Sequence, residues 1–176
     1  MSIRAAILTV SDKGSRGERE DRSGAEIRAF LADLQAEIMT YAVVPDERET
    51  IAARLSDWRN QGNIDLVFTT GGTGLGPRDV TPEATLSVVE RLVPGLPELM
   101  RAAGFQHTPL AYLSRGVAGI AGRMLVINLP GSPKAVRESL AAIQPVLPHA
   151  LEILRGAVTE HSQSWGEGSP FGRGLE

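Results

Sequence analysis

Two glycine-bearing segments of the sequence have residue types that bind phosphate groups. The first, Thr69–Glu83, contains four glycines and one aspartate, Asp79. An apolar run leads into this segment, and Thr81 followed by Pro82 is typical of a helix start. Glycines between a strand and a helix let backbone N–H groups come close to an anion. We therefore expect a phosphate-binding loop over Gly71, Gly72, Thr73 and Gly74.

The second segment, Asn128–Lys134, has the same design and follows another apolar run. Ser132 and Pro133 are suited to the cap and first position of a helix. Lys134 falls in the first helical turn, which is an unfavourable place for a cation and hints at a nearby anionic ligand. Two better-known motifs are excluded: the P-loop pattern is absent, and Pro77 breaks the dinucleotide fingerprint. The binding candidates in this segment are Asn128, Pro130, Gly131, Ser132 and Lys134.

Apolar runs alternate with segments of helical spacing, and this alternation predicts the elements that carry both loops. It indicates an α/β protein with a mainly parallel sheet and right-handed crossovers. Ser23 and Thr81 are the expected caps of the first and third helices, and residues 116–122 are expected to form turns. The expected strands are Arg4–Val10, Ile38–Val44, Ile64–Thr70 and Met124–Leu129, with Leu110–Arg115 as a further candidate. The expected helices are Gly24–Leu34, Glu47–Arg59, Thr81–Leu92, Leu96–Phe105, Pro133–Ile143 and Leu147–Leu154.

The strand order places several polar segments at one edge of the sheet. In parallel α/β sheets, ligands bind outside the carboxyl ends of the strands. Ser11 and Asp12 follow the first strand, Asp46 follows the second, and the two glycine segments follow later strands. Two phosphate-binding loops beside Asp46 and Asp79 suggest a phosphorylated substrate, a nucleotide and Mg²⁺, which prefers carboxylate and phosphate oxygens.

Composition excludes several classes of protein. The net charge of -3 argues against a broad nucleic-acid surface, and the absence of cysteine excludes disulfides and thiolate chemistry. No apolar run approaches the roughly 18 residues of a membrane helix, and we see no signal peptide, so we expect a cytoplasmic protein. We expect one domain over residues 1–156 and a tail, extended or flexible, over residues 157–176.

Five segments carry a resemblance to a known family. In chain order the sequence resembles the molybdopterin-binding family of molybdenum cofactor biosynthesis, and the likeness covers residues 4–156. The resemblance implies a three-layer αβα sandwich of the molybdopterin-binding type. The segments are LTVSD (8–12), VPDE (44–47), TGGTG with PRDVTPEAT (70–74 and 77–85), LSR (113–115) and NLPGSPK (128–134).

The resemblance also implies an activity. It implies adenylyl transfer from Mg-ATP to molybdopterin with release of pyrophosphate, by a homotrimer. Asp46 and Asp79 match the family's catalytic aspartates, and we expect these two carboxylates to hold Mg²⁺, directly or through water. A protein that inserts molybdenum is a candidate partner. The segments that match the family's nucleotide and pterin-phosphate contacts are Gly71, Gly72, Thr73 and Gly74, Ser114, and Asn128, Pro130, Gly131, Ser132 and Lys134. Ser11, Asp12 and Arg115 are further binding candidates.

Other interpretations of these residues remain open. Some members of a sister branch are not adenylyltransferases, so the chain could bind or deliver molybdopterin without adenylating it. A related domain acting on another phosphorylated nucleotide is a third candidate. Asp79 could cap a helix or pair with Arg78, and Asp46 could serve as a turn former or a helix cap. Arg115 could bind an anion or pair at the surface.

Overall fold

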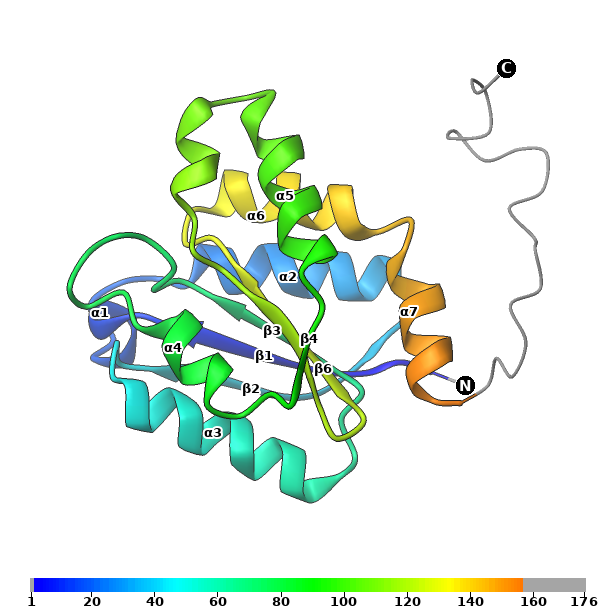
Figure 1. Ribbon diagram of the computed structural model, residues 1–176. Helices are drawn as coiled ribbons and strands as arrows, with labels where there is room; N and C mark the ends of the chain where they lie inside the picture. Colours follow the sequence, from blue (N-terminus) through cyan, green and yellow to red (C-terminus); the bar gives the residue numbers. More distant parts are fainter. Residues whose placement is uncertain (1, 157–176) are drawn as a thin grey trace, which may run out of the picture.

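The computed structural model describes residues 2–156, which form a sheet covered by helices on both faces (Figure 1). The predicted tail lies outside the described residues. The six strands are ordered β2-β1-β3-β6-β5-β4. The strands are β1 (Arg4–Val10), β2 (Glu37–Val44), β3 (Leu66–Thr70), β4 (Arg91–Leu92), β5 (Ala118–Ala121) and β6 (Met124–Leu129). The helices are α1 (Asp12–Ser15), α2 (Arg22–Asp33), α3 (Arg48–Gln61), α4 (Thr81–Leu86), α5 (Gly95–Phe105), the 3₁₀ helix η1 (Pro109–Leu113), α6 (Pro133–Ile143) and α7 (Leu147–Leu154).

The four strands expected from the sequence are the parallel part of the sheet. β1 pairs with β2 and β3, and β3 pairs with β6, all parallel. Every residue of β3 and β6 is buried, as expected for strands covered on both faces. The predicted α/β architecture with a mainly parallel sheet is therefore confirmed.

Alternate residues of the strands face two separate hydrophobic clusters. Ile7 and Phe68 pack with side chains of α2, α5, α6 and α7 on one face. Leu8 and Val67 pack with side chains of α3 and α4 on the other face. Figure 1 shows α2 and α6 on one side of the sheet and α3 on the opposite side. This is the three-layer arrangement that the resemblance implied.

The third expected helix and the turn-rich segment were partly wrong. α4 ends at Leu86, and Leu92 lies in the short antiparallel strand β4. Residues 118–121, expected to be turns, form β5, which pairs antiparallel with β4 and β6. Gly119 has a packing role there, because a Cβ at this position would lie 2.8 Å from the Val89 side chain and 2.9 Å from the Arg91 carbonyl oxygen.

Two other local expectations were also wrong. The candidate strand at Leu110–Arg115 is instead η1, where Pro109 occupies the first turn and the Thr108 hydroxyl accepts the Leu110 N–H at 3.3 Å. The cap of α2 is Asp21, which accepts the Gly24 N–H at 2.8 Å. The Ser23 hydroxyl is therefore available for a different hydrogen bond, which is described below.

An ion-pair cluster closes the amino end of the sheet. Asp65, immediately before β3, bonds with Arg4 at 2.9 Å and with Arg155 at 2.7 Å. Burial opposes ionisation of Asp65, but the hydrogen bonds from Arg4 and Arg155 outweigh it and hold the pKa of this carboxyl far below its usual range. Arg155 also donates to the Ser2 carbonyl at 2.8 Å, so the two ends of the domain are joined at this edge.

Candidate functional site

The two glycine loops meet at the carboxyl edge of the sheet. A Cβ atom at Gly131 would lie 3.5 Å from the Gly71 Cα, so the loop after β6 lies directly against the loop after β3. Side-chain contacts fix this approach. The Thr70 hydroxyl, at the end of β3, donates to the Pro130 carbonyl at 2.7 Å, and the Ser23 hydroxyl of α2 donates to the Gly131 carbonyl at 2.7 Å.

The first loop exposes consecutive backbone donors. Gly71 and Gly72 have φ of 95° and 65°, a left-handed conformation that favours glycine. The N–H groups of Gly72, Thr73 and Gly74 have no hydrogen-bond acceptor among residues 2–156. Successive N–H groups at such a turn form a concave anion-binding surface. The predicted phosphate-binding loop therefore has the donors that a phosphate group requires.

Two residues hold the first loop in shape. The Thr81 hydroxyl donates to the Gly71 carbonyl at 2.9 Å and so holds the loop against the start of α4. Thr81 is the first residue of this helix and not the cap that the sequence had predicted. Arg115 donates to the Gly74 carbonyl at 2.7 Å, to the Asp79 carbonyl, and to the Glu83 carboxylate. The Arg115 guanidinium therefore bonds to the loop at Gly74, to its end at Asp79 and to Glu83 of α4.

The second loop ends in the predicted helix cap. The Ser132 hydroxyl accepts the Ala135 N–H at 3.2 Å, and Pro133 is the first residue of α6. The N–H groups of Gly131 and Ser132 have no acceptor within the described part of the chain. Lys134 points elsewhere: its side chain is 74% exposed, and its Nζ lies 3.9 Å from Glu138.

A polar cleft of about 780 Å³ lies where these loops face the segment between α1 and α2. Gly71, Gly131 and Ser132 contribute to its surface, together with Ser11 at the end of β1. Ser11 also caps α1 by accepting the Gly14 N–H at 3.0 Å. Arg19, Asp21 and Arg22 of the segment before and at the start of α2 also line the cleft. The cleft is large enough and polar enough for a nucleotide.

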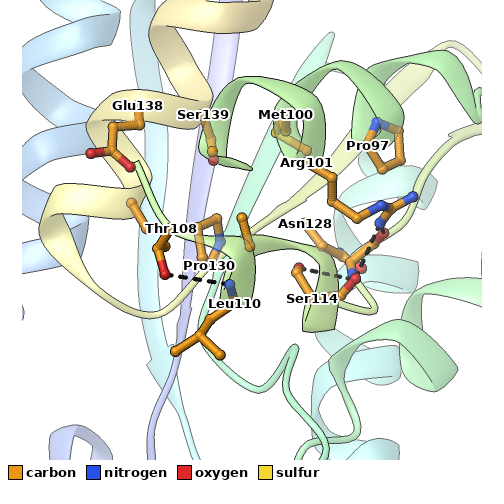
Figure 2. A pocket seen from close by; sticks show the side chains of 14 residues that line it. Pro97, Met100, Arg101, Thr108, Leu110, Ser114, Asn128, Pro130, Glu138 and Ser139 are labelled. Carbon is orange, nitrogen blue, oxygen red and sulfur yellow. Dashed lines mark hydrogen bonds between the residues drawn. The ribbon is translucent and has the colours of Figure 1, made fainter. Parts of the chain in front are cut away.

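A smaller and more apolar pocket of about 200 Å³ lies on the other side of the second loop (Figure 2). Met100 of α5, Leu110 of η1 and Pro130 supply apolar surface, and Ser114 supplies a polar edge. Asn128 lines this pocket but is 1% exposed, and its amide bonds to Thr69, Thr85 and the Val117 N–H at 2.9, 2.9 and 3.2 Å. Asn128 therefore shapes the pocket by joining β6 to β3, to α4 and to the residue before β5.

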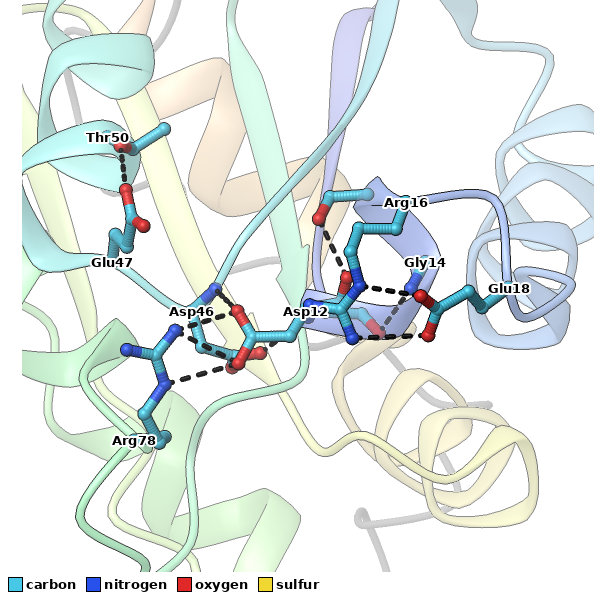
Figure 3. A network of polar contacts seen from close by, with 10 residues as sticks. Asp12, Gly14, Arg16, Glu18, Asp46, Glu47, Thr50 and Arg78 are labelled. Atoms are coloured by element: carbon cyan, nitrogen blue, oxygen red, sulfur yellow. Dashed lines mark hydrogen bonds and ion pairs between the residues drawn. The ribbon is translucent and has the colours of Figure 1, made fainter.

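Asp46 lies beside Gly72 of the first loop, in a network with Asp12 and Arg78 (Figure 3). The Asp12 N–H donates to Asp46 Oδ2 at 2.8 Å, and the Asp46 N–H donates to Asp12 Oδ1 at 3.0 Å. Arg78 donates to both carboxylate oxygens of Asp12 at 2.8–3.1 Å and thereby lowers the pKa of Asp12. Partial burial raises the pKa of Asp46, and the charges of Asp12 and Asp79 act in the same direction.

Asp79 lies on the same loop as the free N–H groups. Its Oδ2 accepts the Gly76 N–H at 2.8 Å, and a Cβ at Gly74 would lie 2.8 Å from the same oxygen. The second oxygens, Oδ1 of Asp46 and Oδ1 of Asp79, have no hydrogen-bond donor among residues 2–156. Within these residues no group of three or more His, Cys, Asp or Glu is arranged as a metal site. Two carboxylate oxygens completed by substrate phosphates and water nevertheless fit Mg²⁺.

Most of the site residues predicted from the sequence lie at the carboxyl edge of the sheet, but they make different kinds of contact. Asp46, Asp79 and the two glycine loops lie together, whereas Arg115 and Asn128 are bonded within the protein. Neither aspartate lines the polar cleft or the apolar pocket; both lie beside the first loop. Arg78 was missed as a site residue because its partner Asp12 is 66 positions away, and no local pattern reveals such a pair.

Among residues 2–156, no helix has the length and apolar character needed to cross a membrane. Residues 6–149 match the family model described as "Probable molybdopterin binding domain". The chain is 42% identical over 157 residues to molybdopterin adenylyltransferase of Helicobacter pylori strain J99, covering 88% of this chain and 89% of that protein.

Two solved structures are similar along most of their length. The molybdopterin biosynthesis enzyme MoaB from Thermus thermophilus has a TM-score of 0.83 at 56% identity, covering 88% of this chain and 97% of that one. The molybdopterin biosynthesis Mog protein from Mycobacterium ulcerans has a TM-score of 0.83 at 36% identity, covering 89% and 99%.

Proposed function

Because the chain belongs to the molybdopterin-binding domain family, we propose that it acts in molybdenum cofactor biosynthesis as a molybdopterin adenylyltransferase. In this reaction an oxygen of the terminal phosphate of molybdopterin attacks the α-phosphorus of ATP. The bond from the α-phosphorus to the bridging oxygen of the β-phosphate breaks, and pyrophosphate leaves with that electron pair.

One observation carries the proposal: two loops with unpaired backbone donors touch each other next to two aspartates. The contact between Gly131 and Gly71 brings the donors of both loops to one place at the sheet edge. Two anion-binding loops side by side suit a reaction between two phosphorylated substrates.

The chain's own residues act mainly by positioning and by neutralising charge. The pterin phosphate is already an anion, so the reaction needs no strong general base; the obstacle is repulsion between two phosphate groups. The N–H groups at Gly72–Gly74 and at Gly131–Ser132 would each hold one phosphate. Asp46 and Asp79 would hold Mg²⁺, which supplies positive charge at the phosphates. These roles require no proton transfer by the protein.

The two cavities differ in a way that suits the two substrates. The pterin would enter the pocket beside Met100 and Leu110, where these side chains can pack against the faces of its rings and Ser114 can bond to its polar rim. A nucleotide fits the larger polar cleft beside Ser11 and Gly71. The second loop separates the two spaces, so phosphates entering from either side would meet at the glycine loops.

The assembly and partners are extensions of the same proposal. We infer that the protein works as a homotrimer and passes its product to a protein that inserts molybdenum. Sedimentation equilibrium tests the first inference: a mass three times that of the chain is expected, and a monomer contradicts it.

The activity is tested by incubating the protein with molybdopterin and Mg-ATP and measuring pyrophosphate and adenylyl-molybdopterin. Equal amounts of both products are expected. If molybdopterin binds while ATP remains intact, the chain is instead a pterin-binding or delivery protein. If neither pterin binding nor pyrophosphate release is observed but another phosphorylated nucleotide is processed, the third interpretation of the sequence holds.

A further inference from the structure

The network of Arg78, Asp12 and Asp46 joins three segments that are distant in the sequence. Arg78 comes from the first glycine loop, Asp12 begins α1, and Asp46 follows β2 (Figure 3). Both oxygens of the Asp12 carboxylate are occupied by Arg78, and Oδ1 also accepts the Asp46 N–H at 3.0 Å. Asp12 therefore has no free oxygen on which to bind a further ligand without losing one of these contacts.

The direction of the Asp46 side chain follows from this network. The Asp12 N–H holds Asp46 Oδ2 at 2.8 Å. The other oxygen, Oδ1, faces the first glycine loop, because a Cβ at Gly72 would lie 3.3 Å from it. Two hydrogen bonds to Asp12, one at the backbone and one at the carboxylate, thus leave one defined oxygen of Asp46 directed toward the free backbone donors.

We propose that Arg78 and Asp12 are positioning residues that fix Asp46 against the first glycine loop. The inference rests on the proposed function, in which Asp46 acts beside the phosphates. It assigns Asp12 a different role from the ligand contact expected from its sequence position. Arg78 holds Asp12 in a two-pronged contact that a guanidinium can make and an ammonium cannot.

The ion pair of Arg78 and Asp12 could instead only stabilise the protein surface. The exposure of the two side chains helps to distinguish this role from the positioning of Asp46. The Arg78 side chain is 60% exposed and that of Asp12 is 30% exposed. Exposed ion pairs contribute little to stability. Loss of Arg78 should therefore leave the unfolding midpoint almost unchanged, while the orientation of Asp46 and the rate of transfer both change.

The first test uses hydrogen–deuterium exchange on the full chain without substrates. In Arg78→Ala the Asp12 carboxylate that accepts the Asp46 N–H is no longer held in place, so this hydrogen bond should open more often and the exchange of the Asp46 N–H should accelerate by about tenfold. Arg78→Lys should behave similarly. Arg59→Ala is the matched control, because Arg59 forms an exposed ion pair with Glu90 away from the loops. Unchanged exchange at Asp46 in Arg78→Ala overturns the proposal.

The second test compares Arg78→Ala, Asp12→Asn and the double variant in steady-state kinetics. Each single change should lower kcat by about tenfold and raise the Mg²⁺ concentration needed for half-maximal rate, with little change in KM for molybdopterin. Because the residues act through one contact, the double variant should be no worse than the poorer single variant. Additive losses overturn the proposal. If the wild-type protein transfers no AMP, the proposed function fails, and the exchange experiment still decides the positioning role.

Discussion

Asp79 and Gly76 bond to each other in both directions. The Gly76 N–H donates to Asp79 Oδ2 at 2.8 Å, and the Asp79 N–H donates to the Gly76 carbonyl at 3.0 Å. The helix-cap role considered from the sequence is not what the structure shows, since α4 begins at Thr81 without a side-chain cap. Asp79 instead closes a tight turn in the glycine loop and keeps its second oxygen available.

This geometry makes Asp79→Asn an informative variant. The amide oxygen of asparagine can still accept the Gly76 N–H, so the loop and the stability should be preserved. The negative charge proposed to hold Mg²⁺ is lost, so AMP transfer should fall by about a hundredfold or more, as for removal of a charged group acting at the reacting phosphates. Pyrophosphate release and molybdopterin binding by fluorescence measure the two effects separately. Loss of pterin binding together with activity would show that Asp79 is a substrate contact.

Gly72→Ala should damage the loop more than an equivalent change elsewhere. Gly72 has φ of 65°, and a new Cβ would overlap the Thr81 hydroxyl and approach Asp46 Oδ1 at 3.3 Å. Gly62→Ala is the control, with φ of 66° and no atom within 4 Å of the new Cβ. Both variants bear the left-handed strain of about 1 kcal/mol, but Gly72→Ala should lose a further 1 to 3 kcal/mol, roughly the cost of overpacking. Urea unfolding compares the two free energies of unfolding. Equal losses would mean that the loop tolerates the methyl group.

A larger side chain in the small pocket should weaken the binding of molybdopterin without affecting that of Mg-ATP. Ala135, in the first turn of α6, lines the pocket beside Met100 and Leu110. Ala135→Phe should fill the space assigned to the pterin and raise KM for molybdopterin at least about tenfold, since a lost apolar contact surface and a steric overlap act together. KM for Mg-ATP should stay the same. A rise in the KM of ATP alone would reverse the assignment of the two cavities.

The buried carboxylate at the amino edge predicts a pH dependence of stability. Arg4 and Arg155 keep the folded-state pKa of Asp65 far below the unfolded value, so its contribution is complete above that unfolded value of about 4 and disappears as the pH falls toward the folded pKa. Asp65→Asn should reduce the free energy of unfolding by about 2 to 4 kcal/mol at pH 7. The difference from the wild type should shrink in acid.

Urea unfolding at several pH values measures this change. Asp57→Asn provides the comparison, because Asp57 is exposed and forms no ion pair among the described residues. A loss in Asp65→Asn that stays constant as the pH is lowered well below the unfolded-state pKa would show that packing, rather than charge, accounts for it.

The sequence predicted the parts of the fold that depend on local patterns. β1, β3 and β6 are nearly continuous apolar runs, and Ser132 with Pro133 marks the start of α6, so these elements were found with their bounds almost intact. The expected meeting of the two glycine loops followed from the rule that parallel strands end at the same edge.

What the sequence did not reveal depends on contacts between distant segments. Gly119 looked like a turn residue because the neighbouring strand that requires its missing side chain cannot be seen locally. Asp21 takes the cap expected of Ser23, because Ser23 bonds to Gly131 in another loop. The engagement of Arg115 with Gly74 and Glu83, and of Arg78 with Asp12, likewise emerges only once the chain is folded.

The ion-pair cluster at the amino end of the sheet, in which Arg155 bonds to Asp65 and to the Ser2 carbonyl, has a practical consequence for engineering. It brings both ends of the described domain to the edge of the sheet opposite the glycine loops. A fluorescent label placed beside Ser2 or at Gly156 would therefore lie at the edge of the sheet opposite the loops.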